Sequence, residues 1–250
     1  MKNEYILRPG ERLDDLQTHG YKLIQRPDAF RFGTDSVLLA DFANPHKGEM
    51  AADLGAGTGA IATLMVAHQP NLHVDAIELQ PEIADMLRRS VSGNGLEDAI
   101  SVHNMDMRES SAVLGRGKMS LCVCNPPYGR DGGALKSTNE STRIARHECG
   151  LTPGEICQSA ALLLKNGGRF AVIYPSPRAF EMMRAMHEHG LAPKRIRTVH
   201  GFALRAPKFV LMDAVKGGGD MLHWLEPLIM YEENGAPTAE WKRIYRVEET

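Results

Sequence analysis

The sequence predicts an α/β fold in which helices cover both faces of a mostly parallel sheet. The first observation is that short apolar runs alternate with amphipathic stretches between residues 49 and 214, as in strands linked by crossover helices. The second is that proline, glycine and helix-capping residues separate these runs. The third is the length of 250 residues, which suits one large domain with small additions, because ~150 residues per domain is typical.

Five apolar runs in series are predicted to be strands, and four helices are predicted among them. The strands are residues 50–53, 73–79, 100–106, 119–124 and 169–174, and the helices are residues 60–68, 81–90, 153–165 and 176–189. Pro81 stands in a first helical turn, where a missing N–H costs little, and Thr152 is placed to cap the third helix. Asn166, Gly167 and Gly168 are expected to end that helix.

The flanking segments are predicted to be smaller additions to this core. Two extended runs, 195–200 and 209–215, are typical of a terminal hairpin, and the pattern upstream favours a strand over 21–25 and a helix over 35–42. We therefore expect an N-terminal extension (1–48) that packs on a main domain (49–219), and a short C-terminal extension (220–250).

Composition excludes several classes of protein. With 29 Lys and Arg against 31 Asp and Glu, the chain is neither a globally basic nucleic-acid coat nor a polybasic membrane anchor. Its longest apolar runs are five residues, far short of the ~20 that span a bilayer. No secretory signal is evident at the N-terminus, so a cytoplasmic location is expected. The four cysteines contain no C-x-x-C pair, which favours reduced thiols over disulfides or a metal site.

A glycine-rich turn follows the first predicted strand. The run Asp53-Leu-Gly55-Ala-Gly57-Thr-Gly59 lets the backbone turn sharply and approach a ligand, although such a run by itself is also compatible with a plain tight turn. Its G-x-G-x-G spacing differs from G-x-G-x-x-G, and the Lys-Ser/Thr pair of a phosphate loop is absent.

Two carboxylates strengthen the case for a ligand. Glu78 and Asp106 end the next two predicted strands, where open α/β sheets bind ligands. Glu78 is placed to accept both ribose hydroxyls, and Asp106 to accept from an adenine amino group. With the glycine turn, they predict a nucleoside site.

The fourth predicted strand ends in Asn125-Pro126-Pro127-Tyr128. Two successive prolines remove donors and fix φ, so a stiff corner follows the strand. The Asn125 side-chain carbonyl and the Pro126 backbone carbonyl are placed to accept both hydrogens of a planar NH₂ group, and Tyr128 to stack on its ring. The alternative is a Pro-Pro turn with Asn125 as a local cap.

These residues together resemble a known family. Residues 53–59, Glu78, Asp106 and 125–128 resemble the class I S-adenosylmethionine-dependent methyltransferases that carry the Asn-Pro-Pro-Tyr motif. The sequences at 30–39, 146–148, 199–200 and 214–218 are similar to the bacterial tRNA(Val) adenine-N6 methyltransferase group.

The resemblance implies a Rossmann-like, seven-stranded sheet whose last strand, 209–215, is antiparallel. It implies S-adenosylmethionine as the cofactor, with no metal, and a catalytic set of Asn125, Pro126, Pro127 and Tyr128. The implied cofactor-binding residues are Thr34, Asp35, Asp53, Gly55, Gly57, Gly59, Glu78, Asp106 and Asn125. Thr34 and Asp35 have an alternative as an N-cap for the helix that begins near Ser36.

An RNA substrate requires local basic patches, and two are present. The candidates after the motif are Arg130, Lys136, Arg143 and Arg146; those near the end are Lys194, Arg195, Arg197, Phe202, Arg205 and Lys208. The roles of His147 and His200 are left open. We expect methylation of adenine N6 in tRNA by a monomer or homodimer; the alternatives are a protein glutamine methyltransferase, a DNA adenine methyltransferase and an RNA-binding module without catalysis.

Overall fold

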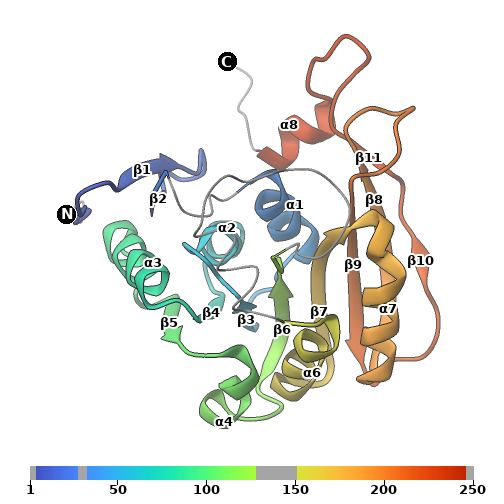
Figure 1. Ribbon diagram of the computed structural model, residues 1–250, viewed down its shortest axis with the longest axis horizontal. Helices are drawn as coiled ribbons and strands as arrows, with labels where there is room; N and C mark the ends of the chain where they lie inside the picture. Colours follow the sequence, from blue (N-terminus) through green and yellow to red (C-terminus); the bar gives the residue numbers. More distant parts are fainter. Residues whose placement is uncertain (1–3, 28–32, 128–150, 246–250) are drawn as a thin grey trace.

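A central sheet organises the chain (Figure 1). The computed structural model describes residues 4–27, 33–127 and 151–245, and in that part of the chain the sheet has nine strands. Its order is β10-β8-β9-β7-β6-β3-β4-β5, with β11 also pairing to β8. A separate hairpin of β1 (Arg12–Asp15) and β2 (Lys22–Gln25) lies outside it.

Five strands form the parallel part of the sheet, and the terminal hairpin completes it. The parallel strands are β3 (Met50–Leu54), β4 (His73–Glu78), β5 (Ile100–Asn104), β6 (Met119–Cys124) and β7 (Leu164–Pro175). The strand β9 (Phe209–Lys216) is antiparallel to β7 and to β8 (Leu191–His200), between which it lies. The predicted antiparallel last strand is therefore confirmed.

Helices cover both faces, as predicted. One face carries α1 (Thr34–Ala43), α2 (Ala60–His68) and α3 (Pro81–Asn94). The other carries α4 (Ser110–Leu114), α6 (Pro153–Leu163) and α7 (Ala179–Glu188), with the 3₁₀ turns η1 (Met107–Glu109) and η2 (Ser176–Arg178) leading into α4 and α7. A short helix, α8 (Ala239–Tyr245), packs on α1.

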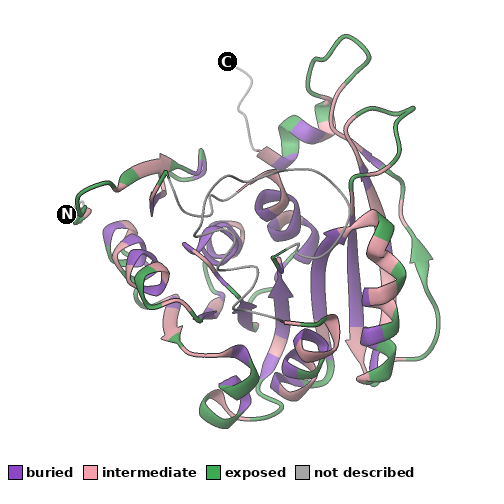
Figure 2. Cartoon of the chain, viewed as in Figure 1, coloured by how far each residue is buried: buried purple, intermediate pink, exposed green. Residues whose placement is uncertain are grey.

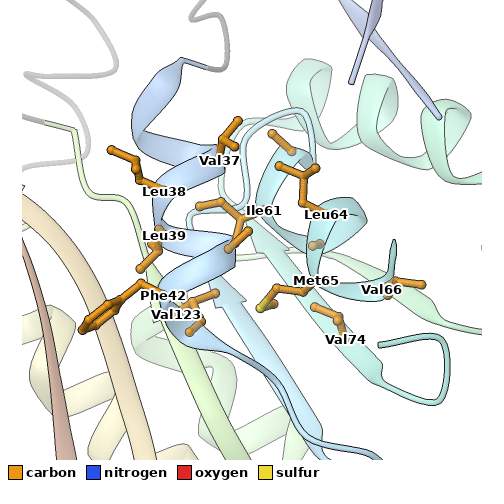
Figure 3. Packing of buried hydrophobic residues seen from close by; sticks show 14 of the residues in the cluster. Val37, Leu38, Leu39, Phe42, Ile61, Leu64, Met65, Val66, Val74 and Val123 are labelled. Atoms are coloured by element: carbon orange, nitrogen blue, oxygen red, sulfur yellow. The ribbon is translucent and has the colours of Figure 1, made fainter. Parts of the chain in front are cut away.

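The period of two along each strand divides the buried residues into two cores. On β6, Leu121 and Val123 face the α1 and α2 layer, whereas Cys122 and Cys124 face the α6 and α7 layer. The central strands are buried on both faces (Figure 2), so they appear in the sequence as continuous apolar runs. The packing of α1 against α2 is shown in Figure 3.

Three of the four cysteines are described, and they lie in the core. Cys122, Cys124 and Cys157 are free, buried thiols, as their spacing predicts. Burial raises the pKa of Cys157 to about 12, so that thiol stays protonated at neutral pH. Cys149 lies outside the described residues. None of the described helices is long and apolar enough to cross a bilayer.

The expectation of seven strands is too low by two. The short strands β10 (His223–Trp224) and β11 (Leu228–Ile229) lie in the segment expected to be a C-terminal extension, and both pair in parallel with the outer edge of β8. Each contains only two residues, too few for an alternating pattern to be visible in the sequence. The division into 1–48, 49–219 and 220–250 stays a prediction.

Several predicted boundaries are wrong for identifiable reasons. The helix α3 continues through Gly93 and ends where Gly95 adopts a left-handed conformation with φ of 66°. The helix α6 ends at Leu163, so Gly167 and Gly168 lie in β7 and do not terminate the helix. The strand β5 ends at Asn104, two residues earlier than expected.

The N-terminal hairpin is anchored on α3 by hydrogen bonds. The backbone N–H of Ile24 donates to Ser90 Oγ at 2.8 Å, and the buried Ser90 hydroxyl donates to the Met86 carbonyl. In addition, the largely buried Arg89 guanidinium donates to both carboxylate oxygens of Glu11. The sequence predicts β2 but not β1, whose half-exposed residues show no apolar alternation.

Candidate active site

Three strand ends lie side by side at one edge of the sheet. Leu54 of β3 pairs with Ile77 of β4 on one side and with Cys124 of β6 on the other. The next residue on each strand is therefore Gly55, Glu78 or Asn125, and all three occupy the same register position. The parallel register thus joins the glycine turn, the first carboxylate and the start of the Asn-Pro-Pro segment at the carboxyl edge of the sheet.

The glycine turn is held to β4 by one carbonyl group. The N–H groups of Gly55 and Ala56 both donate to the Ile77 carbonyl, each at 2.9 Å. Gly55, Gly57 and Gly59 have φ values of 77°, 56° and 90°, which side-chain-bearing residues rarely adopt. Gly59 forms the N-cap of α2, and a Cβ there would lie 2.1 Å from Leu87 Cδ1; a Cβ at Gly57 would meet nothing within 4 Å.

Glu78 is buried and receives hydrogen bonds from the turn. Its Oε2 accepts from the Gly57 N–H at 2.9 Å, and its Oε1 accepts from the Gln80 N–H at 2.8 Å. Burial raises the pKa of the Glu78 carboxyl, while these backbone N–H groups oppose the shift. The Leu79 N–H and the Gln80 side chain also act on this carboxyl and lower its pKa, so Glu78 is held in place by the backbone around the turn.

Asp53 lies beneath the turn with no polar partner. It is fully buried, and neither carboxylate oxygen makes a hydrogen bond within the part of the chain that the structure describes. Burial raises its pKa to about 7; the backbone N–H of Ala62 opposes the shift without forming a well-aligned bond, and the Glu78 charge adds to it. A buried carboxylate of this kind is stabilised by a nearby cation.

Asp106 lies two residues beyond the end of β5, and its carboxylate is already engaged. Oδ1 accepts from the Arg108 N–H at 2.9 Å as the N-cap of η1, and both oxygens accept from the Arg108 guanidinium. The Arg108 side chain holds the pKa of the Asp106 carboxyl below its usual range. The Nη1 atom of Arg108 also donates to Glu155. Asp106 was expected at the end of β5, but Asn104 occupies that position, and its Nδ2 donates to the Glu78 and Leu79 carbonyls.

The start of α1 lies at the same edge as the glycine turn. The helix runs from Thr34 down to Ala43, whose carbonyl accepts from Arg169, and Asn44 then leads towards the first residue of β3. The N-cap is Gly33 without a side-chain bond, so the capping alternative for Thr34 is wrong. Asp35 Oδ1 accepts from the Ser36 N–H at 3.0 Å, and a Cβ at Gly33 would lie 2.8 Å from that oxygen.

The motif at the end of β6 is described as far as Pro127. Asn125 is half-buried, Pro126 is buried and Pro127 is exposed, so the corner turns outwards from the sheet edge. Tyr128 lies outside the described residues. The same holds for Arg130, Lys136, Arg143, Arg146 and His147.

Three basic residues of β8 are engaged in contacts within the protein. Arg195 forms an ion pair with the buried carboxylate of Asp213 and lies over the Phe42 ring at 4.8 Å. Arg197 donates to both carboxylate oxygens of Glu240 at 2.8 and 2.9 Å. Lys194 Nζ donates to the Gly219 carbonyl. These contacts give the three residues a structural role. Fewer of the basic residues predicted to bind RNA are therefore available for it.

The loop that follows β8 is well anchored at the carboxyl edge. His200 Nδ1 lies 2.7 Å from the Arg205 carbonyl, which assigns this histidine a structural role. At the other end, the Ser176 hydroxyl donates to the Pro207 carbonyl, and its N–H donates to the Lys208 carbonyl. Phe202 and Leu204 remain 41% and 93% exposed.

Sequence reasoning missed two residues beside the glycine turn. Gln25 is fully buried at the end of β2, and its Nε2 donates to Thr58 Oγ1 at 3.0 Å. Leu79 directly follows Glu78 and is 39% exposed, so it offers apolar surface for a flat ring. Leu79 could have been predicted, because it is an apolar residue directly after an acidic strand end. Nothing in the sequence indicates a role for Gln25. No group of three or more potential metal ligands occurs among the described residues.

Comparison with known proteins identifies similar sequences over most of the chain. Residues 28–189 match the family model described as Methyltransferase small domain. A tRNA1(Val) (adenine(37)-N6)-methyltransferase from Phocaeicola vulgatus is 31% identical, over 74% of this chain and 76% of its own length. Proteins of the same name are 28% identical in Porphyromonas gingivalis, over 86% and 87%, and 31% identical in Erwinia tasmaniensis, over 68% and 74%.

Solved structures share the fold. A predicted O-methyltransferase from Agrobacterium tumefaciens superposes with a TM-score of 0.71 at 22% identity, covering 85% of this chain and 96% of that one. Pyrococcus horikoshii TYW2 in complex with MeSAdo superposes with a TM-score of 0.57 at 18% identity, covering 85% and 74%. At these identities, the likeness concerns the fold alone.

Two glycines of the turn should respond differently to alanine. We expect Gly59→Ala to lower the free energy of unfolding by about 2 to 4 kcal/mol, because it combines a positive φ with a clash against buried Leu87. Gly57→Ala should cost only about 1 kcal/mol, since its Cβ enters open space. Urea unfolding of both variants measures the difference, and equal losses would contradict the described geometry.

The buried Asp53 carboxyl predicts a pH dependence of stability. Its pKa of about 7 lies above the value of 3.8 for an unperturbed carboxyl, so the folded state holds the proton more tightly. Stability from this group is therefore present at low pH and lost as the pH rises towards 7. Between pH 5 and pH 8, Asp53→Asn should gain roughly 2 kcal/mol in the free energy of unfolding relative to the wild type. Urea unfolding at both pH values tests this, and a constant difference would contradict it.

Proposed function

The chain belongs to the methyltransferase small domain family and to the tRNA1(Val) (adenine(37)-N6)-methyltransferases, and we propose that it methylates N6 of adenine 37 in that tRNA. It is an S-adenosylmethionine-dependent methyltransferase. The observation that supports the proposed reaction is the shared register of Gly55, Glu78 and Asn125, since it brings the glycine turn, a carboxylate and the Asn-Pro corner next to each other.

The residues beside the glycine turn fit S-adenosylmethionine. Gly57 has a left-handed backbone and open space where a Cβ would be, so a ligand can approach the main chain. Asp53 supplies a buried carboxyl without a hydrogen-bond partner among the described residues, and a ligand that carries an ammonium and a sulfonium group would stabilise its charged form. Glu78 has two carboxylate oxygens beside the turn, each with one backbone hydrogen bond, and they are the proposed acceptors for a pair of ribose hydroxyls.

Apolar contact around the adenine of the cofactor comes from residues beside these acceptors. Leu79 exposes apolar surface at the end of β4, and Met107 Cε lies 3.6 Å from the position of a Cβ at Gly55. Because the Asp106 carboxylate is bonded to Arg108, we propose that its part in adenine recognition is through a remaining lone pair. Thr34 and Asp35 are proposed to approach the amino-acid end from the first turn of α1.

Asn125 and Pro126 are the proposed ligands of the substrate amine. The Asn125 side-chain carbonyl and the Pro126 backbone carbonyl would each accept one N–H of the adenine amino group, and Tyr128 would stack on the base. Accepting both hydrogens stabilises the positive charge that develops on nitrogen in the transition state. The two prolines fix the corner before the substrate arrives, so little entropy is lost on binding.

The chemistry requires alignment more than proton transfer. When bound, S-adenosylmethionine supplies a methyl group that its sulfonium already activates. The protein then has to hold the amine nitrogen in line with the methyl carbon and the sulfur. Such orientation of the reactants can lower the barrier substantially. The stiff strand ends on which Gly55 and Asn125 stand provide that rigidity.

RNA contact is proposed for the anchored loop of residues 201–208. It follows β8, which is separated from β6 by β9 and β7, so the loop lies roughly 15 Å from the end of β6 along the same edge. The loop carries Arg205, Lys208 and the exposed Phe202 ring, and it has no acidic residue. Such a set suits phosphate contact and base stacking by single-stranded nucleotides beside the target.

A protein glutamine amide also presents a planar NH₂ group, but the relatives from Porphyromonas gingivalis, Phocaeicola vulgatus and Erwinia tasmaniensis are tRNA methyltransferases by name, which favours RNA. A DNA substrate is disfavoured for the same reason. With a tRNA substrate, we propose that the enzyme acts in the cytoplasm. We also propose that it acts as a monomer or homodimer and uses no metal ion.

Removal of the Asn125 amide should abolish the reaction. We expect Asn125→Ala to lower kcat about a thousandfold through loss of an acceptor for the amine, and Tyr128→Ala to reduce it strongly. Labelled methyl transfer to total RNA and to a protein extract, with nucleoside analysis, checks both the product and the substrate. Asn234→Ala is a matched control, because that side chain accepts from Ala236 in an exposed turn. Label that appears only in protein would overturn the RNA assignment, and full activity of Asn125→Ala would overturn the mechanism.

The anchored loop should affect RNA binding alone. Phe202→Ala should raise the KM for tRNA about tenfold, the loss expected for one stacked base, and leave the KM for S-adenosylmethionine unchanged. Trp224→Ala is the control, since Trp224 is 69% exposed but pairs with Ile196 in the middle of β8. Steady-state kinetics with both substrates measure the effect, and equal behaviour of the two variants would contradict the proposal.

A further inference from the structure

The last residue of β2 buries a polar side chain where an apolar one would be less costly. Leu23, Ile24 and Gln25 are all fully buried, and the period of two places Leu23 and Gln25 on the same face of the strand. Leu23 belongs to the apolar core on the α1 and α2 side of the sheet. Because a buried amide costs free energy unless it is hydrogen-bonded, the position of Gln25 requires a specific polar partner.

That partner lies in the glycine turn. Gln25 Nε2 donates to Thr58 Oγ1 at 3.0 Å, and both side chains are buried. Thr58 stands between Gly57, where a Cβ would meet nothing within 4 Å, and Gly59, where a Cβ would meet Leu87 of α3. The Thr58 hydroxyl is therefore directed at the hairpin, while the backbone of the residue before it is open to a ligand.

The hairpin is tied to α3, so Gln25 has a fixed position from which to hold the turn (Figure 1). At the start of β2, the Lys22 N–H donates to Asn94 Oδ1 at 3.0 Å, and Asn94 Nδ2 donates to the Lys22 carbonyl at 2.8 Å. One helical turn earlier on α3, Ser90 Oγ accepts from the Ile24 N–H. The strand is thus bonded to two successive turns of α3, and Gln25 extends this line of contacts to the glycine turn.

The glycine turn is consequently held from two sides. On the β4 side, the Ile77 carbonyl and the Glu78 carboxylate accept from the backbone N–H groups of residues 55–57. On the hairpin side, Gln25 holds the side chain of the next residue, Thr58. Glycine has more accessible backbone conformations than other residues, so a turn with three glycines leaves its binding conformation more readily when a tie is lost. Apparent affinity falls in proportion to the fraction of molecules that keep that conformation.

We propose that Gln25 is a positioning residue of the cofactor site, whose amide holds Thr58 so that the glycine turn keeps the conformation that binds S-adenosylmethionine. The inference rests on the proposed function, in which Gly57 offers its main chain to the cofactor. It assigns the N-terminal hairpin a role in cofactor affinity that acts through Thr58. Since coupling between two sites is reciprocal, cofactor binding stabilises the docked hairpin in return.

The first measurement compares cofactor binding by two variants of the N-terminal segment. Gln25→Met keeps the length of the side chain and removes the donor, so the dissociation constant for S-adenosylmethionine should rise about threefold to tenfold, as expected for one lost neutral hydrogen bond. Tyr5→Phe is the matched control and should bind as the wild type does, because the Tyr5 hydroxyl donates to Asn94 at the last residue of α3. Calorimetric titration of the full chain measures both, and thermal unfolding compares their stability.

The second measurement tests whether Gln25 acts through Thr58. Thr58→Val removes the acceptor and should weaken S-adenosylmethionine binding, whereas Thr58→Ser keeps the hydroxyl and should retain most of the affinity. In the Thr58→Val background, Gln25→Met should cause no further loss, since the bond is already absent. Additive losses would show that Gln25 acts on the whole fold. If Gln25→Met does not fold, the difference between Thr58→Val and Thr58→Ser decides the question, and equal affinities of these two would overturn the proposal.

The third measurement uses the reciprocal effect. S-adenosylmethionine should slow the hydrogen exchange of the Ile24 N–H, which is bonded to Ser90, more in the wild type than in Gln25→Met. A merely structural role of Gln25 would give the same slowing in both proteins. In methyl-transfer assays, Gln25→Met should raise the KM for the cofactor and leave kcat unchanged.

The outcomes separate this inference from the proposed function. If the wild type and a folded Gln25→Met bind S-adenosylmethionine with equal affinity, the positioning role is overturned and the proposed function stands. Equal slowing of Ile24 exchange in the two proteins would also overturn the positioning role. Absence of any binding by the wild-type chain would overturn both.

Discussion

The two hydrogen bonds that the Ile77 carbonyl accepts from Gly55 and Ala56 are the contact on which the candidate site depends. They hold the glycine turn against the neighbouring strand, and a third bond, from the Gly57 N–H to Glu78, holds its tip. The turn therefore lies beside β4 in the position that a continuation of β3 would have. Because Leu54 also pairs with Cys124, the same register places Asn125 on the other side of the turn.

This arrangement includes a buried carboxylate that destabilises the folded chain, and other interactions in the fold have to offset it. Asp53 keeps a carboxylate in the core without a hydrogen-bonded partner, and such a group destabilises the folded chain whenever it is charged. Two apolar layers, one on each face of the sheet, supply the compensating burial. Because Asp53 lowers stability when charged and lies two residues before Gly55, its position supports the ligand-binding role proposed for it.

Local patterns predicted the parallel strands and their helices well, because each of these elements buries several residues at a regular spacing. The helix α2 and the strand β6 have the predicted bounds. Prediction was wrong where a glycine is compatible with more than one structure. The helix predicted over 81–90 continues through Gly93 to Asn94, and Gly167, predicted to end a helix, lies in β7. Two-residue strands such as β10 carry no periodic signal at all.

The sequence by itself determined the fold class, the glycine turn and the carboxylate at the end of β4, since these depend on backbone conformation and strand ends that local residues encode. Only the tertiary structure decided which charged residues are available for a substrate: Arg195 and Arg197 have the composition of an RNA contact, yet Asp213 and Glu240, which lie 18 and 43 residues away, engage them. Contacts between segments far apart in the chain follow from how the helices and strands pack, and no local pattern records them.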